Sequence, residues 1–155
     1  MSKFMDIAIE EAREGIKNGH GGPFGAVVVK DGEIIGRGHN CVLKNNDPTA
    51  HGEVMAIRNA CQNLNTFDLS GAVLYTTCYP CPMCLCAMMW ANIDKCYYGC
   101  TSKDADEIGF RDDNFYDKIA SKEFYEKFNV CANSDDTGAC ETLFKDYLDT
   151  EHKLY

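Results

Sequence analysis

Two short segments that carry metal-ligating side chains, with one predicted strand between them, constrain the fold of this chain most. The first is His51-Gly52-Glu53, and the second is Pro80-Cys81-Pro82-Met83-Cys84. Each lies at the predicted start of a helix, because chain breakers precede a helix expected to begin near residue 49 or 50, and Pro82 suits the first turn of the next helix. Residues 72–76 form a short apolar run typical of a strand. A strand between two helices can hold both helix starts side by side, so the pattern favours an α/β fold.

The spacing of the ligand residues indicates a catalytic zinc site. Cys81 and Cys84 are three residues apart, on one face of a first helical turn, where the helix dipole favours the thiolate form that zinc binds. His51 has the corresponding position on the other helix. Three protein ligands leave one position of a tetrahedral ion open, which is typical of catalytic zinc. We therefore expect one Zn²⁺ per chain, with water or hydroxide as its fourth ligand.

Glu53 is the candidate proton carrier of this site. It follows His51 by two residues and is not needed to complete the ligand set. A carboxylate at this position can take a proton from the zinc-bound water and deliver it to a leaving group. Gly52, between these two residues, costs about 1 kcal/mol of helix stability relative to Ala. Its presence suggests that backbone and substrate come close there, which makes Gly52 a candidate substrate-binding residue.

Other interpretations of the cysteines remain open. Cys78, Cys81 and Cys84 also have the spacing of part of an iron-sulfur motif, although no fourth cysteine follows in the usual Cys-Pro context. A structural zinc completed by Cys78 or Cys86 is a second alternative, and it would leave Glu53 without a role. We predict that the remaining cysteines are buried small hydrophobic residues: Cys41, Cys61, Cys96, Cys100, Cys131 and Cys140.

Length and charge limit the class of protein further. A chain of 155 residues that is 45% hydrophobic can bury one core, which predicts a single domain over residues 1–155. The first twenty residues lack the apolar run of a signal peptide, and no segment approaches the roughly 18 apolar residues of a membrane span. We therefore expect a soluble protein of the reducing cytoplasm, in which the ten cysteines serve metal binding or burial. The net charge of -9 disfavours nucleic acid as a partner and favours a small substrate.

Periodicity and turn residues predict the other elements. Helices are expected at residues 2–16 and 141–148, and strands at residues 26–30, 33–37 and 95–99. Asp31-Gly32 suits a type I′ turn between the first two of these strands. Parallel pairing of the last strand with residues 72–76 would complete a crossover unit around the helix that follows Cys81.

Apolar patterns in the two ligand-bearing helices predict how each is buried. The helix that begins near residue 49 or 50 has its expected buried stripe at Val54, Ile57, Cys61 and Leu64. Residues 83–91 are apolar on every side of the next helix. We therefore expect that helix to be buried all round.

The chain resembles the cytidine-deaminase-like superfamily from its first helix to about Lys118, and within it most closely the bacterial guanine deaminases. Four segments carry the resemblance: Gly21-Gly22-Pro23-Phe24-Gly25-Ala26, Asn46-Asp47-Pro48-Thr49-Ala50-His51, Cys78-Tyr79-Pro80-Cys81-Pro82-Met83-Cys84 and Trp90-Ala91. The pairing of H-x-E with P-C-x-x-C is the signature of zinc-dependent nucleobase deaminases. Similarity to the guanine enzymes lies in Glu107-Ile108-Gly109-Phe110-Arg111-Asp112-Asp113 and in the terminal Tyr155.

The resemblance implies a three-layer α/β/α fold with a mixed central sheet, and hydrolytic deamination of a nucleobase, with guanine converted to xanthine and ammonia. Phe24 is then expected to lie against the base and Asn40 to hydrogen-bond it. Asp112 is expected to be a second catalytic acid, and Tyr155 to close the pocket. The resemblance also implies a homodimer in which the C-terminal tail, residues 121–155, is exchanged between subunits.

Each of these residues also has a simpler interpretation that needs no substrate. Phe24 is then an ordinary core residue, and Asn40 caps the end of a strand. Asp112 is a solvated acid, and Tyr155 is only the end of the chain. These interpretations remain beside the functional ones.

Three departures from the family pattern leave the substrate open. The family usually has Ala where this chain has Gly52, and that Gly, with Met5-Asp6-Ile7-Ala8, Gly36-Arg37-Gly38-His39-Asn40 and Leu74-Tyr75-Thr76-Thr77, is similar to fungal cytosine deaminase. Residues 121–150 match the guanine enzymes poorly. The zinc core is also similar to the tRNA adenosine deaminases, although Lys and Arg are sparse in the tail. Cytosine or another free base or nucleoside is the main alternative substrate, and a flipped base in RNA is a less favoured one.

Overall fold

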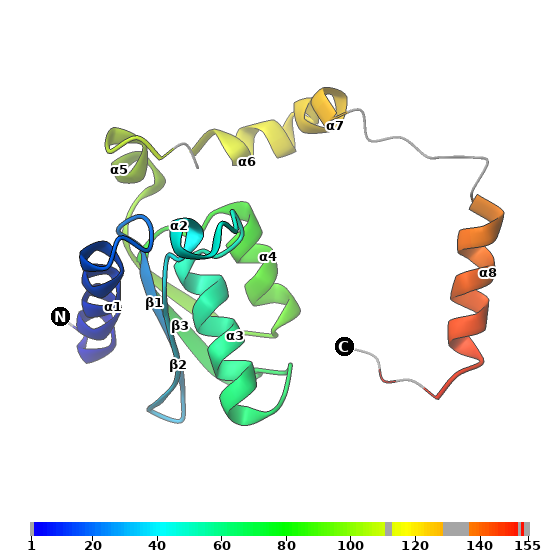
Figure 1. Ribbon diagram of the computed structural model, residues 1–155, viewed down its shortest axis with the longest axis horizontal. Coiled ribbons are helices and arrows are strands. Elements are labelled where there is room, and N and C mark those ends of the chain that lie inside the picture. Colours follow the sequence, from blue (N-terminus) through cyan, green and yellow to red (C-terminus); the bar gives the residue numbers. More distant parts are fainter. Residues whose placement is uncertain (1, 111–112, 129–136, 152, 154–155) are drawn as a thin grey trace. The chain divides into compact units, whose positions relative to one another are not determined.

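The computed structural model describes residues 2–110, 113–128, 137–151 and 153 (Figure 1). The chain forms two units, Met1–Tyr116 and Asp117–Tyr155. The first unit contains the whole sheet and the helices that pack on it. The second contains the end of α6 (Asp113–Ala120), α7 (Glu123–Phe128) and α8 (Thr137–Leu148).

A four-stranded mixed sheet forms the centre of the first unit. Its strands are β1 (Gly25–Lys30), β2 (Glu33–His39), β3 (Ala72–Cys78) and β4 (Lys95–Cys100), in the order β2-β1-β3-β4. β1 is antiparallel to both of its neighbours, and β3 is parallel to β4. Positive φ angles at Asp31 (51°) and Gly32 (81°) are those of a type I′ turn. The predicted hairpin, parallel pair and mixed sheet are therefore confirmed.

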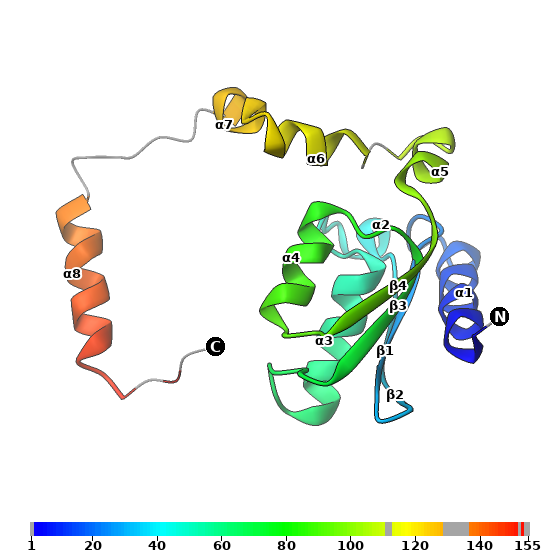
Figure 2. The same ribbon diagram turned by 180° about the vertical axis from the view of Figure 1, so that it is seen from behind.

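Helices cover both faces of this sheet, which gives the expected three layers. α1 (Lys3–Lys17) lies on one face, and α3 (Gly52–Leu64) and α4 (Pro82–Trp90) lie on the other (Figures 1 and 2). Successive residues of β1 point to opposite faces, as the period of a strand requires. Ala26 and Val28 join the core under α3, whereas Val27 joins the core under α1. The α/β/α architecture predicted from the resemblance is confirmed.

The face that α3 buries differs from the predicted stripe. Ala56, Ile57 and Ala60 are buried, whereas Val54 and Cys61 are only partly covered and Leu64 is exposed. Two strand glycines explain the difference: a Cβ at Gly36 or Gly38 would collide with the backbone of α3 at Ala56. Because the helix lies so close to β2, its contact face has to be built from small residues.

The expectation that the helix after Cys81 is buried all round is wrong. In α4 only Cys84 and Met88 are buried, whereas Met89 and Trp90 are 70% and 67% exposed. α4 packs on α3 with one face only, and its outer face lies on the surface of the described part of the chain. An apolar helix with an exposed face is typical of a surface that another subunit or protein covers.

Two short helices and the C-terminal helix α8 are the remaining elements. α2 (Val42–Asn45) precedes α3, and α5 (Ser102–Glu107) follows β4. The predicted helix at residues 141–148 is confirmed, and α8 begins four residues earlier than expected, at Thr137. No helix among the described residues is long and apolar enough to cross a membrane.

Burial of the remaining cysteines follows the prediction only in part. Cys41 is buried, and Cys61 and Cys96 are partly buried. Cys100 and Cys140 are exposed, contrary to the prediction, because they lie on the edge strand β4 and on the exposed helix α8. Cys131 lies outside the described residues.

Candidate active site

Two helix starts bring the predicted ligands together. His51 is the N-cap residue of α3, and Cys81 is the N-cap residue of α4, both with extended backbone angles. α3 therefore begins at Gly52, later than the predicted residue 49 or 50. Residues 47–51 form a turn instead, in which the Asp47 carboxylate accepts hydrogen bonds from the Thr49 amide (2.8 Å) and hydroxyl (2.7 Å). The turn delivers His51 to the positive end of α3.

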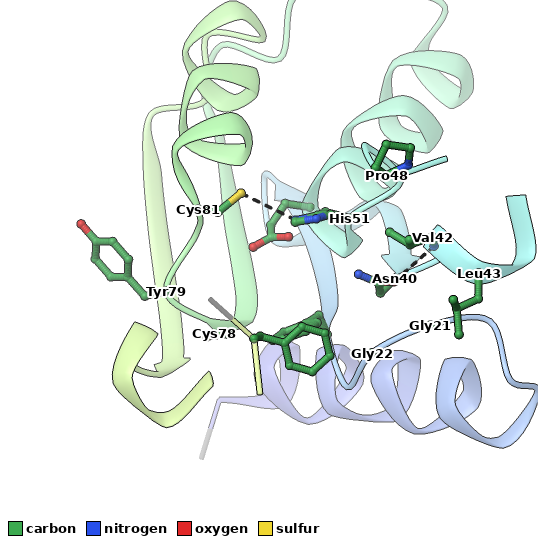
Figure 3. Close-up of a pocket in the computed structure, with 13 residues that line it drawn as sticks. Gly21, Gly22, Asn40, Val42, Leu43, Pro48, His51, Cys78, Tyr79 and Cys81 are labelled. Atoms are coloured by element: carbon green, nitrogen blue, oxygen red, sulfur yellow. Dashed lines mark hydrogen bonds between the residues drawn. The ribbon is translucent and has the colours of Figure 1, made fainter. Parts of the chain in front are cut away.

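The three ligand side chains converge at a distance that fits zinc. Nδ1 of His51 lies 3.6 Å from Sγ of Cys81 and 3.6 Å from Sγ of Cys84. Zn–N and Zn–S bonds of about 2.1 and 2.3 Å at a tetrahedral angle place the ligand atoms about 3.5 Å apart. Figure 3 shows His51 and Cys81 pointing toward one another from their two helices. His51, Cys81 and Cys84 form the zinc site.

The hydrogen bond between the two thiols shifts their pKa values in opposite directions. A hydrogen bond from Cys84 lowers the pKa of Cys81, with a smaller contribution from His51, and burial acts in the opposite direction. The same interaction, together with burial, raises the pKa of Cys84. Zinc binds cysteine as the thiolate, so a bound ion would deprotonate both thiols.

Glu53 is a buried carboxyl at the edge of this site. Its Oε1 accepts a hydrogen bond from the Thr76 hydroxyl on β3 (3.1 Å), and the Cys84 thiol lies 3.5 Å from Oε2. The residue is 5% exposed, and burial raises the pKa of its carboxyl. A carboxyl in such surroundings holds a proton more readily than one in water, which suits a group that shuttles protons.

A cavity of about 430 Å³ opens beside the ligands (Figure 3). It is lined by Gly21, Gly22, Phe24, Asn40, Val42, Leu43, Pro48, His51, Glu53, Cys78, Tyr79, Cys81 and Phe110. Asn40 is buried and its Oδ1 accepts a hydrogen bond from the Val42 amide (3.2 Å), so its amide nitrogen is the group available to donate into the cavity. The walls are mainly apolar with a few convergent polar groups, as in small-molecule sites.

Of the residues predicted to bind substrate, Phe24 and Asn40 line the cavity and Gly52 does not. A Cβ at Gly52 would lie 3.0 Å from the carbonyl oxygen of Phe24, so the close approach there is between two backbone segments. Asp112 and Tyr155 lie outside the described residues.

Some residues of the site were given no role from the sequence, among them Phe110, Tyr79 and Thr76. Phe110 packs edge-on against Phe24 at 4.7 Å, and Tyr79 forms another part of the wall. Thr76 is the hydrogen-bond partner of Glu53. A signal for Thr76 was present, since alternate residues of a strand share one face. This places the polar side chain with Ala72 and Leu74 in the core, where it needs a partner.

The fold and the site together define a zinc-dependent deaminase: a His-Cys-Cys metal site at two helix starts, with a buried carboxyl and a small cavity beside it. Residues 1–100 match the family described as the cytidine and deoxycytidylate deaminase zinc-binding region, and the chain belongs to this family.

Its relatives include enzymes with two different substrates. The chain is 51% identical over 116 residues to the guanine deaminase of Bacillus subtilis, an alignment that covers 75% of this chain and 74% of that protein. The X-ray structure of guanine deaminase from Bacillus subtilis matches with a TM-score of 0.80 and 37% identity, over 100% of this chain and 99% of the other. The tRNA-specific adenosine deaminase of Aquifex aeolicus is 43% identical over 100 residues, which cover 64% of this chain and 66% of the relative.

Proposed function

We propose that this protein is a guanine deaminase, which converts guanine to xanthine and ammonia. The observation that carries the proposal is the buried carboxyl of Glu53, which lines the same small cavity as the zinc ligands His51 and Cys81. The similarity to a guanine deaminase over the full length of the chain supports guanine as the substrate. A cavity of about 430 Å³ is in the range of sites for small molecules, which also favours a free base.

The residues of the cavity have separate tasks in this reaction. Zinc held by His51, Cys81 and Cys84 supplies Lewis acidity, which makes water acidic enough to deprotonate near neutral pH. Glu53 takes that proton and delivers it to a ring nitrogen. It then takes the remaining proton of the hydroxyl group added to the ring carbon and passes it to the amino group, which leaves as ammonia. Asn40 donates a hydrogen bond from its amide nitrogen to an acceptor on the base.

Apolar side chains orient the ring against these polar groups. Phe24 and Phe110 meet at 85° and form one wall of the cavity, against which the face of a planar base can pack. Asp112 and Tyr155 are proposed, from the resemblance alone, to be a second acid and the residue that closes the pocket. Gly52 is proposed to act indirectly, by letting α3 approach the Phe24 backbone.

Ammonia release tests the proposal. Purified enzyme is given guanine, cytosine, adenine and their nucleosides in parallel, with the Glu53→Gln variant as the blank. Guanine is expected to turn over, and Glu53→Gln to retain zinc and fold while the rate falls by a factor of ~10² to 10⁴. Turnover of cytosine or a nucleoside in place of guanine would keep the zinc chemistry and overturn the assignment of the pocket. Activity only on RNA, with salt-sensitive binding, would instead indicate an editing enzyme.

We also propose that the enzyme is a homodimer with exchanged C-terminal tails. Two apolar surfaces support this: the outer face of α4, with Met89 70% exposed, and α8, with Leu143 and Leu148 63% and 68% exposed. Apolar faces of this kind in a single chain are typical of surfaces buried in an oligomer. Light scattering on a size-exclusion column should give twice the chain mass, and Met89→Lys should shift the protein toward the monomer.

A reducing compartment such as the cytoplasm is the proposed location. None of the described cysteines forms a disulfide, and two of them are zinc ligands. Thiolates that bind zinc have to be kept reduced, which cytoplasmic conditions provide. Fractionation of the producing cells, with activity measured in each fraction, tests this location.

A further inference from the structure

A second cluster of metal-ligating side chains lies outside the zinc site. Among the described residues, His20, His39 and Cys41 also bring one ligand atom each within 4.8 Å of one another. They come from three elements: the loop between α1 and β1, the last residue of β2, and the N-cap of α2. Nδ1 of His20 and Nε2 of His39 are 2.8 Å apart. Both imidazoles are partly buried and the cysteine is buried.

A carboxylate already orients the His39 ring, as is usual for a histidine that binds a metal. Its Nδ1 lies 3.1 Å from Oε2 of Glu11 on α1. A carboxylate on one imidazole nitrogen fixes the tautomer and directs the lone pair of the other nitrogen, which is the usual second shell of a metal-bound histidine. Here that lone pair, on Nε2, points toward His20. A Cβ at Gly15 would come within 2.8 Å of the His39 ring, so α1 packs directly against the ring and restricts its rotation.

Backbone hydrogen bonds fix the other two ligands. The carbonyl oxygen of His20 accepts from the amides of Leu43 and Lys44, both at 3.0 Å, and the Cys41 amide donates to the carbonyl of Ala50 (2.8 Å). The loop that carries His20 is thereby tied to α2, which begins directly after Cys41. The three side chains are therefore brought together by the fold, and their proximity does not depend on side-chain contacts alone.

We propose that His20, His39 and Cys41 form a second metal site, which takes a borderline transition metal such as Zn²⁺, with Glu11 orienting His39. Two imidazoles and a thiol suit such an ion and exclude Mg²⁺ and Ca²⁺, which prefer oxygen ligands. On binding, the His20–His39 hydrogen bond is replaced, the two nitrogens separate to about 3.3 Å, and His20 moves its proton to Nε2. Cys41 releases its thiol proton to solvent.

The proposed metal site lies next to the wall of the catalytic cavity. Its position gives it a role, since Gly21 and Asn40, which are adjacent in sequence to the ligands, line that cavity. A bound ion would clamp together the two segments that form this wall.

Metal counting on the whole zinc-containing enzyme tests the proposal. After equilibrium dialysis against micromolar Zn²⁺, the wild-type protein is expected to hold about two zinc ions per chain, one at each cluster. Cys41→Ser and, separately, His20→Asn should hold about one. Cys61→Ser, which changes a partly buried cysteine of α3, is the matched control and should hold two. A wild-type count of one, or a count of two in both Cys41→Ser and His20→Asn, would overturn the proposal.

Cobalt provides a second readout that separates this site from the active centre. Co²⁺ added to enzyme that keeps one zinc per chain should produce a thiolate-to-cobalt absorption band in the wild type and in Cys61→Ser. The band should be absent in Cys41→Ser, while the one retained zinc ion and an unchanged far-UV circular dichroism spectrum show that the catalytic zinc and the fold remain. A band that persists in Cys41→Ser would mean that cobalt binds elsewhere and would refute the assignment. Failure of the proposed guanine activity would not change either result.

Discussion

Thr76 holds one oxygen of the Glu53 carboxylate in place. Its hydroxyl donates to Oε1 of Glu53 at 3.1 Å, in a part of the core where both side chains are buried. Thr76→Val keeps the shape of the side chain and removes the donor. The loss of one buried hydrogen bond to a charged group is worth roughly 1–2 kcal/mol, so kcat for guanine should fall about tenfold while KM changes little.

Steady-state kinetics on Thr76→Val and on a control, Thr66→Val, check this prediction. Thr66 accepts a hydrogen bond from the Asp68 amide (3.1 Å) in a loop beyond the end of α3, and its loss should leave kcat unchanged. An unaltered kcat in Thr76→Val would show that Glu53 keeps its position without this partner.

At the scale of the elements, the close packing of α3 on β2 requires a residue without a side chain at Gly38. A Cβ at this position would collide with the Ala56 amide and lie 2.8 Å from the Gly52 carbonyl, both backbone atoms of the helix that begins at the active site. Gly38→Ala should therefore lower the free energy of unfolding by roughly 1–3 kcal/mol, as overpacking does, and should reduce activity by displacing His51 and Glu53. Urea denaturation and ammonia release measure the two effects.

Gly138 supplies the control for this substitution. It lies in α8, and a Cβ there would meet no atom within 4 Å. Gly138→Ala should be neutral or raise the free energy of unfolding by up to about 1 kcal/mol, because Ala is the better helix former. Equal destabilisation by both substitutions would mean that the helix–strand distance is not what limits position 38.

The Asp68 carboxylate joins the loop before β3 to the loop before β4, at the end of these strands that lies away from the active site. Asp68 accepts hydrogen bonds from the Ser70 amide (3.0 Å) and hydroxyl and from the Asn92 side chain (3.3 Å). The hydrogen bonds from Ser70 contribute most to holding the pKa of Asp68 below its ordinary value of 3.8. A depressed pKa contributes stability that is complete above the unfolded-state pKa and is lost as pH falls through the folded-state value.

Asp68→Asn should therefore lower the urea midpoint at pH 7, and the difference from the wild type should shrink as pH falls below 3.8. Denaturation curves at pH 7 and at about pH 3 measure this difference. A gap that stays constant over this range would show that the Asn92 and Ser70 contacts do not depend on the charge of Asp68.

Local signals in the sequence predict the elements well, and long-range packing accounts for the errors. The hairpin at Asp31-Gly32 and the helix start at Cys81 depend on a few neighbouring residues, and both are found as predicted. The buried face of α3 depends on Gly36 and Gly38 in another element, so the choice of large apolar residues such as Leu64 was wrong. Phe110 was missed as a wall residue for the same reason, since its contact with Phe24 joins distant parts of the chain.

At the scale of the whole molecule, the apolar outer face of α4 is left uncovered in the described part of a single chain. Its apolar sequence predicts burial, yet Met89 and Trp90 are exposed in the described part of the chain. The prediction takes no account of a second chain, which can cover such a face as well as the protein's own core can. Burial in a dimer would reconcile the sequence pattern with the structure.

Exchange of the tails makes a distinct prediction for mixed dimers. One variant carries Glu53→Gln and an intact tail; the other keeps Glu53 and lacks residues 151–155, which include Tyr155. With exchange, a mixed dimer has one site that combines Glu53 of one chain with the tail of the other. Random pairing of equal amounts should then restore about one quarter of the wild-type activity, although each variant alone has little. If each tail instead serves its own chain, no mixed dimer contains a complete site, and the activity of the mixture will equal the average of the two variants.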